Sequence, residues 1–307
     1  MPITKTEKIW MDGELVDWDD AHIHILTHTL HYGCGVFEGI RAYPTRSGPA
    51  VFRLTDHIQR LADSAKIFMI DMPFDVPELV EATKQTVRIN GLDECYIRPI
   101  VYLGYGEMGL NPLPSPVNVA IAVWPWGAYL GEEGMARGVR MKISSWVRHD
   151  PNAMPPAAKG TGMYINSSMA KVEALKAGYD EAILLSPHGH VSECTGENLF
   201  IVRRGRIITP PSSAGALEGI TQNSVMTMAR DLGLDITTGQ LVRSDLYTAE
   251  EGFLTGTAAE VVPIQSVDDR LVGDGTPGPI TRQLQELYSQ AVRGQLDRYK
   301  DWVEHVH

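Results

Sequence analysis

The sequence predicts an α/β protein of the α+β type, made of two domains that each hold a mixed sheet and helices. Its 307 residues are enough for two hydrophobic cores. Short runs rich in β-branched and aromatic residues alternate with amphipathic segments of helical period along the chain. The alternation stops at one place, where proline, glycine and large aromatics cluster after Val123. We expect the two domains to divide there.

The composition argues against several classes of protein. With 43% hydrophobic and 21% charged residues, the chain is typical of globular proteins rather than disordered or fibrous ones. A formal net charge of −11 without a basic cluster argues against nucleic acid or anionic membrane as a partner. The longest apolar run, Val117–Trp126, is too short to cross a bilayer. The three cysteines are odd in number and lack Cys-x-x-Cys spacing, so we expect reduced thiols in a cytoplasmic protein.

The first domain is expected to begin with a hairpin and a histidine-rich segment. Lys8–Met11 and Glu14–Val16 flank the turn signal at residues 12–13. The histidines after them could suggest a metal site, but no carboxylate or thiolate set lies at ligand spacing beside them. The simpler interpretation is a strand edge that leads into the turn Gly33–Gly35, and we expect no metal. The four histidines are His22, His24, His28 and His31.

A strand and a helix are expected next. Val36–Tyr43 alternates bulky with small or charged side chains, as a half-buried strand does when it walls a cleft. Thr55 and Asp56 offer the N-cap of a helix with an apolar face. Arg60 lies about 200° around this helix from Ile58, outside the apolar stripe. It is therefore available to solvent or to an anion.

A second helix is expected from Pro77 to Asn90, followed by a strand at Cys95–Tyr102. This strand places Tyr96 and Arg98 on one face. A phenol and a guanidinium two residues apart can both reach one carboxylate, although a surface cross-strand pair is an acceptable alternative.

The expected division places a small N-terminal α/β domain at residues 1–127, an interdomain loop at 128–137 and a larger C-terminal α/β domain at 138–307. Aromatic side chains at such junctions often line small-molecule sites. The second domain is expected to contain strands at Val139–Ile143, Glu181–Ser186, Leu199–Val202, Ile207–Ile208 and Phe253–Thr257, and helices at Tyr164–Lys176, from Thr221 to Leu232, and from Pro279 to the terminus.

Lys159 is the candidate reactive residue of the second domain. Two prolines stiffen the chain before it, and Ala157, Ala158, Gly160 and Gly162 would let a planar partner approach its amine. The expected helix after it would offer backbone N–H groups to an anion. A solvated lysine in a linker is the alternative that local composition leaves open.

The combination of motifs resembles the class IV aminotransferases, and within them the branched-chain amino acid aminotransferases. The resemblance covers nearly the whole chain. It is carried by Tyr32-Gly33, Val36–Arg41, Arg60-Leu61, Tyr96–Pro99, Pro125–Leu130, Ala158-Lys159, Ser192-Glu193, Gly196–Phe200, Leu217, Gly219–Thr221 and Gly256–Glu260.

The resemblance implies the fold-type IV architecture and a pyridoxal 5′-phosphate cofactor (PLP, or PMP in its amino form). Lys159 would form the internal aldimine and then move a proton between the substrate Cα and the cofactor. Glu193 would keep the pyridine nitrogen protonated, and Tyr164 would bind the phenolic oxygen. The phosphate and the ring would be held by Arg60, Leu217, Gly219, Ile220, Thr221, Gly256 and Thr257.

It also implies transamination of L-leucine, L-isoleucine and L-valine with 2-oxoglutarate. An apolar pocket separates side chains by only about 1–3 kcal/mol per methylene, so all three could be accepted. Arg98 would bind the second carboxylate of 2-oxoglutarate. The substrate would otherwise meet Phe37, Gly39, Tyr96, Met108, Trp126, Tyr129, Thr257, Ala258 and, from a neighbouring subunit, Tyr32 and Leu110. The chain would then form at least a homodimer, or a larger assembly such as a hexamer.

Other functions remain to be separated from this one. The loop 102–108 adds a tyrosine and a glutamate near the expected pocket, which leaves fine specificity open. A D-amino acid or amine transaminase and an aminodeoxychorismate lyase would share the cofactor residues but differ around Phe37–Gly39 and Tyr96–Arg98. A histidine-cluster metal hydrolase and a catalytically silent binding protein are rivals of other classes. A visible spectrum and a metal analysis distinguish the latter two.

Overall fold

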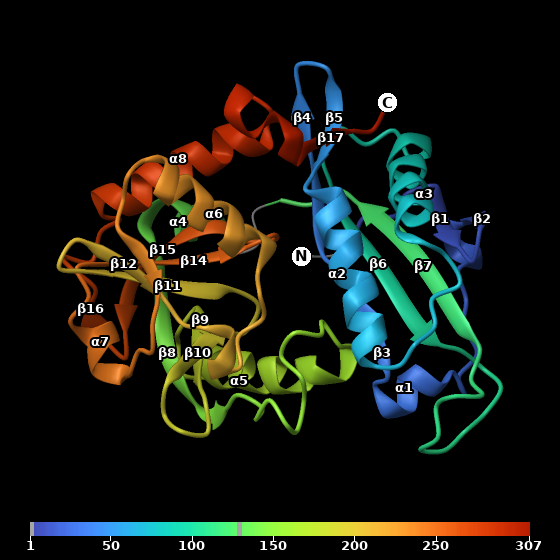
Figure 1. Ribbon diagram of the computed structural model, residues 1–307, viewed down its shortest axis with the longest axis horizontal. Coiled ribbons are helices and arrows are strands. Elements are labelled where there is room, and N and C mark those ends of the chain that lie inside the picture. Colours follow the sequence, from blue (N-terminus) through green and yellow to red (C-terminus); the bar gives the residue numbers. More distant parts are fainter. Residues whose placement is uncertain (1–2, 128–130) are drawn as a thin grey trace. The chain divides into compact units, whose positions relative to one another are not determined.

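The computed structural model describes residues 3–127 and 131–307, and its chain divides into two compact units (Figure 1). The first unit comprises Met1–Trp126, Ala158–Met163 and Gln290–His307, and the second comprises Gly127–Ala157 and Tyr164–Ser289. The α/β class with two sheets is confirmed. Among the described residues, no helix has the length and apolar character needed to cross a membrane.

The first unit is built on a sheet in the order β17-β5-β4-β6-β7-β1-β2, with β3 paired to β6. Every described pairing in it is antiparallel, so the mixed character expected of both sheets is confined to the second. Its strands are β1 (Lys8–Met11), β2 (Glu14–Asp17), β3 (Gly35–Phe37), β4 (Ile40–Thr45), β5 (Gly48–Phe52), β6 (Cys95–Leu103), β7 (Val117–Trp124) and β17 (Val303–His305).

Helices α2 (Leu54–Ile67) and α3 (Val76–Ile89) pack against this sheet and form its core (Figure 1). From α2, Leu54, Ile58 and Leu61 are fully buried in that core. Asp75 begins α3 through a reciprocal capping box with Glu78. The unit also has the short helix α1 (His28–Tyr32) and the 3-10 turns η1 (Trp18–Asp20), η2 (Thr161–Met163) and η4 (Asp297–Trp302).

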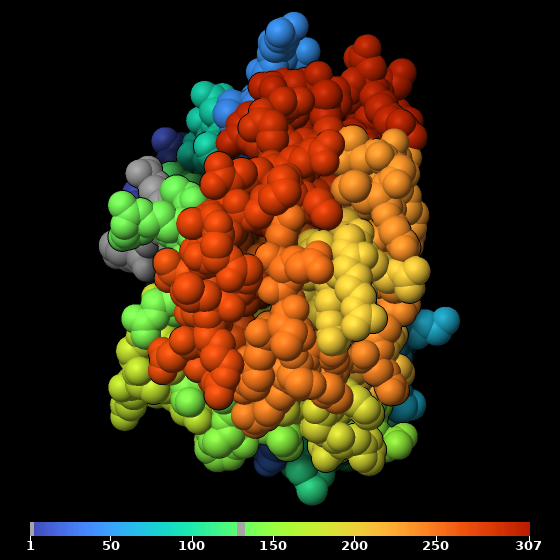
Figure 2. Space-filling model, turned by 90° about the vertical axis from the view of Figure 1, so that its left-hand side faces the viewer, coloured from blue at the N-terminus to red at the C-terminus, as the bar shows by residue number. Residues whose placement is uncertain are grey.

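The second unit is built on a sheet in the order β10-β9-β8-β15-β14-β11-β12-β13, with β16 paired to β15. The pairs β8–β9, β8–β15 and β12–β13 are parallel, and the rest are antiparallel. Its strands are β8 (Val139–Val147), β9 (Glu181–Leu185), β10 (Val191–Cys194), β11 (Asn198–Arg203), β12 (Arg206–Thr209), β13 (Ile236–Thr238), β14 (Glu251–Gly256), β15 (Glu260–Val267) and β16 (Arg270–Leu271). On the surface shown in Figure 2, the yellow β11–β12 segment lies beside orange segments, in line with the β11–β14 and β12–β13 pairings.

Helices pack on this second sheet through small or apolar faces. Helix α5 contacts β8 and β9, and its buried residues include Ala170 and Ala174, whereas Val172 and Leu175 are exposed. The carboxylate of Glu251 accepts the backbone N–H groups at the start of α8. The helices are α4 (Gly131–Arg137), α5 (Tyr164–Lys176), α6 (Ile220–Asp231), α7 (Arg243–Tyr247) and α8 (Pro279–Val292), with the 3-10 turn η3 (Ser212–Ala214).

The compact units depart from the expected division in three segments. Residues 131–137 of the expected interdomain loop form α4. The Lys159 segment packs with the first unit, because Gly160 bridges to Val36 and Gly162 donates its N–H to Gly33. The C-terminal helix ends at Val292, after which β17 pairs with β5 of the first sheet.

Three local expectations in the first unit also need correction. The histidine segment forms helix α1 rather than a strand edge. The expected strand Val36–Tyr43 is interrupted at Glu38, whose carboxylate binds residues of α2. Helix α2 begins at Leu54, before the expected N-cap, and Glu304 of β17 accepts the N–H of Thr55 at 2.7 Å. The other strands and helices named above lie within a few residues of their expected places.

Candidate active site

Lys159 lies in the first unit, and its backbone is fixed on both sides. Its N–H donates to the Ser64 hydroxyl of α2 at 3.0 Å, and its carbonyl accepts the N–H of Phe37 at 3.1 Å. The side chain is half-buried, and its Nζ lies 5.2 Å from the centre of the Phe37 ring. A linker lysine would show none of these restraints, so the structure favours the reactive interpretation of Lys159.

The glycines after Lys159 serve close packing of the chain. A Cβ on Gly160 would lie 2.5 Å from the Phe68 ring, and one on Gly162 would lie 3.1 Å from the Gly33 carbonyl oxygen. These contacts account for two of the small residues that the sequence suggested would make room for a planar partner. They hold the lysine segment against the first unit.

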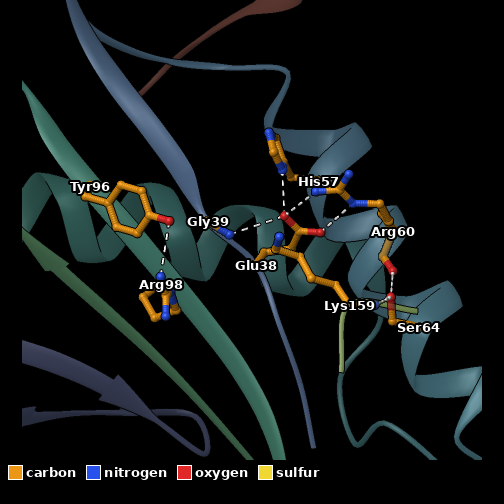
Figure 3. Close-up of polar contacts among 8 residues, drawn as sticks. All are labelled: Glu38, Gly39, His57, Arg60, Ser64, Tyr96, Arg98 and Lys159. Carbon is orange, nitrogen blue, oxygen red and sulfur yellow. Dashed lines mark hydrogen bonds and ion pairs between the residues drawn. The ribbon is translucent and has the colours of Figure 1, made fainter. Parts of the chain in front are cut away.

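A buried carboxylate, Glu38, lies at the centre of the polar contacts in this unit (Figure 3). Arg60 donates from Nε to one of its oxygens at 2.7 Å and from Nη2 to the other at 2.9 Å. The second oxygen also lies 2.8 Å from His57 Nδ1 and 3.3 Å from the Gly39 N–H. Both oxygens of the carboxylate therefore meet donors.

The surroundings set the charges of this cluster. Burial by itself would raise the pKa of Glu38, but the positive charge of Arg60 and the hydrogen bonds from His57 and Arg60 outweigh it and hold the pKa far below its ordinary value. Burial lowers the pKa of His57, and Arg60 and Lys159 lower it further, against the opposing effect of Glu38. At neutral pH the cluster is thus a Glu38–Arg60 ion pair with a neutral imidazole that donates from Nδ1.

Arg60 was expected to bind the cofactor phosphate. In the structure its guanidinium is bound by an anion of the chain itself, Glu38, through Nε and Nη2. A guanidinium has five N–H donors in one plane, and this fork fixes the orientation of that plane. The phosphate role of Arg60 stays a prediction.

The expected substrate residues of the first unit form an aromatic cluster around one guanidinium. Arg98 donates to the Tyr96 hydroxyl at 3.1 Å and lies 4.7 Å from the centre of the Phe37 ring. The Trp126 ring lies 4.9 Å from that of Tyr96. Gly39 belongs to the cluster for a steric reason, since a Cβ there would lie 2.0 Å from the Tyr96 hydroxyl.

Two other groups of expected substrate residues differ in their surroundings. Tyr32, Met108 and Leu110 are exposed, at 40%, 47% and 88%. His28 of α1 fixes their loops together, because its Nε2 lies 2.8 Å from the Gly109 carbonyl and its ring lies 4.6 Å from that of Tyr32. Tyr129 lies outside the described residues.

In the second unit, Glu193 of β10 is buried and held by two donors. Arg148 Nη2 lies 2.7 Å from one carboxylate oxygen, and the Leu217 N–H donates to the other at 2.9 Å. Arg148 is buried as well and reaches the Gly215 carbonyl and the Ser167 hydroxyl. The arrangement keeps a charged carboxylate beside the chain segment that leads to α6.

That segment ends at a helix N-terminus. Asn198 donates to the Leu217 carbonyl at 2.9 Å, and Gly219 is the N-cap of α6, whose first residues are Ile220 and Thr221. A Cβ on Gly219 would lie 2.0 Å from the Asn198 side chain, so a glycine is required there. The N–H groups of a helix start are suited to binding a phosphate.

The remaining expected residues of the second unit lie on two elements. Gly256, Thr257 and Ala258 form the turn between β14 and β15, and next to it the fully buried Thr255 hydroxyl has no hydrogen-bond partner among the described residues. Tyr164 is the first residue of α5 and is half-buried.

Sequence reasoning missed several residues of these clusters. Glu38, His57 and Ser64 support the lysine-bearing side, and Arg148 and Asn198 support Glu193 and Leu217. One signal was available, since the spacing of His57, Arg60 and Ser64 places all three on one side of a helix. Arg148 gave no signal because it follows an ordinary strand.

The chemistry of these groups fits a phosphorylated pyridine aldehyde. An amine on a fixed backbone suits the aldehyde, a buried carboxylate suits the pyridine nitrogen, and a helix N-terminus suits the phosphate. A metal site finds no support: across residues 3–127 and 131–307 no three His, Cys, Asp or Glu side chains are grouped so that they could hold an ion.

Comparison with known proteins identifies similar chains. The model of the family "Amino-transferase class IV" matches residues 35–267. A branched-chain-amino-acid aminotransferase of Pseudomonas aeruginosa is 48% identical over 294 residues, which cover 96% of this chain and 95% of the relative.

Solved structures agree with this result. The crystal structure of the Escherichia coli branched-chain amino acid aminotransferase superposes with a TM-score of 0.97 at 43% identity, covering 99% of this chain and 100% of that one. A thermophile enzyme of the same name, labelled T.th. and complexed with N-(5′-phosphopyridoxyl)-L-glutamate, superposes with a TM-score of 0.95 at 46% identity and 99% coverage of both chains.

Replacing Glu38 by Ala should destabilise the protein by about 3–5 kcal/mol, because the charge of Arg60 is left buried without its partner. Chemical denaturation of the cofactor-free protein measures this loss. Asp17→Asn, which breaks the exposed Lys8–Asp17 pair, is the control and should cost less than about 1 kcal/mol. Equal losses in the two variants would contradict the proposed burden on Glu38.

Glu197 supplies a pH-dependent prediction. Burial raises the pKa of its carboxyl, the negative charge of Glu181 raises it further, and it reaches about 8 against an ordinary 4.5. Between these values the folded state binds the extra proton, so this group lowers the free energy of unfolding as the pH rises from about 5 to 8. Glu197→Gln should remove that slope and gain at least about 1 kcal/mol on the wild type over this interval.

Denaturation midpoints at pH 5, 6.5 and 8 test the expectation. The exposed residue Glu14 provides a matched control as Glu14→Gln, whose stability should follow that of the wild type at each pH. A constant difference between Glu197→Gln and the wild type would show that Glu197 does not carry the extra proton.

Proposed function

The chain belongs to the class IV aminotransferase family, and from this premise we propose that it transaminates L-leucine, L-isoleucine and L-valine. It transfers their amino group to 2-oxoglutarate and yields the branched-chain 2-oxo acids and L-glutamate. The observation that carries the reaction type is Lys159, whose backbone is hydrogen-bonded on both sides and whose amine lies over the Phe37 ring. The relatives that bear the name of this activity match nearly the full chain.

The cofactor is pyridoxal 5′-phosphate, which supplies an electron sink for the bond changes at the substrate Cα. Lys159 Nζ holds the cofactor covalently and, once released, accepts the Cα proton and returns it. Glu193, held charged by Arg148 and the Leu217 N–H, keeps the pyridine nitrogen protonated. Tyr164 binds the phenolic oxygen of the ring.

Other groups bind the phosphate. Arg60, oriented by Glu38, and the N–H groups at the start of α6 are the donors suited to it. Leu217 and Gly219 precede that helix, and Ile220 and Thr221 begin it. Gly256 and Thr257 add the backbone and hydroxyl of the β14–β15 turn.

Substrate selection rests on the aromatic cluster of the first unit. Tyr96 holds the α-carboxylate, together with the backbone at Thr257 and Ala258, and Arg98 takes the second carboxylate of 2-oxoglutarate. Phe37, Gly39, Met108, Trp126 and Tyr129 enclose the aliphatic side chain. The phosphopyridoxyl-glutamate bound to the T.th. relative supports the choice of acceptor.

A second copy of the chain completes the site. Tyr32 and Leu110 leave apolar surface exposed on the first unit, at 40% and 88%, and we expect them to contact the substrate of a neighbouring subunit. The protein should therefore sediment as a dimer or a larger assembly, and Leu110→Asp should shift it towards the monomer and lower turnover. A wild-type protein that sediments as an active monomer would contradict this arrangement.

Replacing Lys159 by Ala tests the function directly. The purified wild type should be yellow from the lysine-bound cofactor, and Lys159→Ala should lose this absorption and at least roughly a thousandfold of turnover, since both the covalent bond and the proton carrier are removed. Lys176→Ala, an exposed lysine at the end of α5, should change neither. A colourless wild type that contains stoichiometric metal would overturn the proposal.

A substrate panel tests the choice of amino donor. L-Leucine, L-isoleucine and L-valine with 2-oxoglutarate should follow ping-pong kinetics, with kcat/KM values within about two orders of magnitude of one another. Faster reaction of D-alanine than of L-leucine would assign the chain to the D-amino acid transaminases of the same superfamily.

A further inference from the structure

Ser64 joins two residues that the proposed function assigns to one cofactor. Its Oγ accepts the N–H of Lys159 at 3.0 Å and donates to the carbonyl of Arg60 at 2.7 Å (Figure 3). Lys159 is the covalent anchor, and Arg60 is the expected phosphate anchor. One hydroxyl thus connects the backbones of both anchors.

The bond to Lys159 is more than the usual behaviour of a helical serine. A serine hydroxyl inside a helix commonly donates to the carbonyl four residues earlier, and the bond to Arg60 is of that kind. The bond from Lys159 spans 95 residues of sequence and uses the remaining acceptor side of the same oxygen. Ser64 is fully buried, so no bulk water can replace this acceptor.

The position of Ser64 on α2 strengthens the connection. His57, Arg60 and Ser64 follow one another at helical spacing and are all turned towards Glu38 and the lysine segment (Figure 3). The Lys159 carbonyl is bound separately, by the N–H of Phe37. Loss of the Ser64 bond would therefore release one side of Lys159 while the other side stays attached.

We propose that Ser64 is a positioning residue that holds the Lys159 backbone in register with Arg60, and so directs the lysine amine to the cofactor. This inference rests on the proposed function. Without the Ser64 acceptor the Lys159 peptide group moves to find another partner, and its amine moves with it. Small misplacements of a reacting group lower the rate of the chemical step far more than they lower binding.

Three variants separate this role from a structural one. Ser64→Ala removes the acceptor, and Ser64→Thr retains the hydroxyl as the conservative rescue. Thr83→Val is the matched control, because the buried Thr83 hydroxyl of α3 donates to the carbonyl four residues earlier, at 2.7 Å, and holds no catalytic segment. Ser64→Ala and Thr83→Val should lower the melting temperature by similar amounts.

The readouts should divide in a specific way. In Ser64→Ala, kcat should fall roughly 10- to 100-fold with KM within about threefold, and the pH midpoint of the visible absorption band should shift. Binding of pyridoxamine phosphate, which forms no bond to lysine, should stay within about threefold of the wild type. In the cofactor-free protein, the amide hydrogen of Lys159 should exchange at least about fivefold faster. Ser64→Thr should restore these values, and Thr83→Val should leave them unchanged.

Two results would overturn the inference. The first is a Ser64→Ala enzyme with wild-type kcat, spectral midpoint and Lys159 exchange. The second is a parallel fall of kcat and pyridoxamine phosphate affinity in both Ser64→Ala and Thr83→Val, which would make Ser64 an ordinary core residue. A wild type that never shows lysine-bound cofactor would instead refute the proposed function, and amide exchange of Lys159 would still report on the Ser64 contact.

Discussion

The first unit depends on one ion pair in a place where charges are costly. Glu38 is fully buried between β3 and β4, and it is tolerated there only because Arg60 and His57 supply donors to both of its oxygens. The pair interrupts what would otherwise be one strand and binds α2 to that interruption. The same helix then presents Ser64 to Lys159. The order of the lysine-bearing side thus follows from neutralising a single carboxylate.

The second unit handles its buried carboxylates in two ways. Glu193 has an arginine and a backbone N–H within reach and keeps its charge partner close. Glu197, four residues later, lies near Glu181 in a region where burial raises its pKa, so it holds a proton at neutral pH. Two glutamates of one motif therefore carry different charges because their immediate neighbours differ. The charged one is the one next to the segment that leads to α6.

Much of this architecture could be predicted from local sequence, and the limits have physical causes. Hydrophobic period and turn residues located most strands and helices, and the small residues and prolines around Lys159 marked it as unusual. Glu38 was hidden because a charged residue in an alternating strand normally faces solvent. The place of Lys159 in the first unit depends on bonds to Gly33, Val36 and Ser64, which are remote in sequence. Resemblance to a family supplied roles that spacing alone could not.

The β17 strand carries a consequence for how the chain matures on the ribosome. β17 pairs with β5, and its Glu304 accepts the N–H of Thr55 at the start of α2. The Lys159 segment, which the same unit needs, emerges only midway through synthesis. The N-terminal part of the nascent chain therefore waits with an open sheet edge until β17 emerges, whereas the second unit is complete earlier. The unit that is begun first is finished after the other, which makes it the part of the nascent chain most in need of chaperone protection.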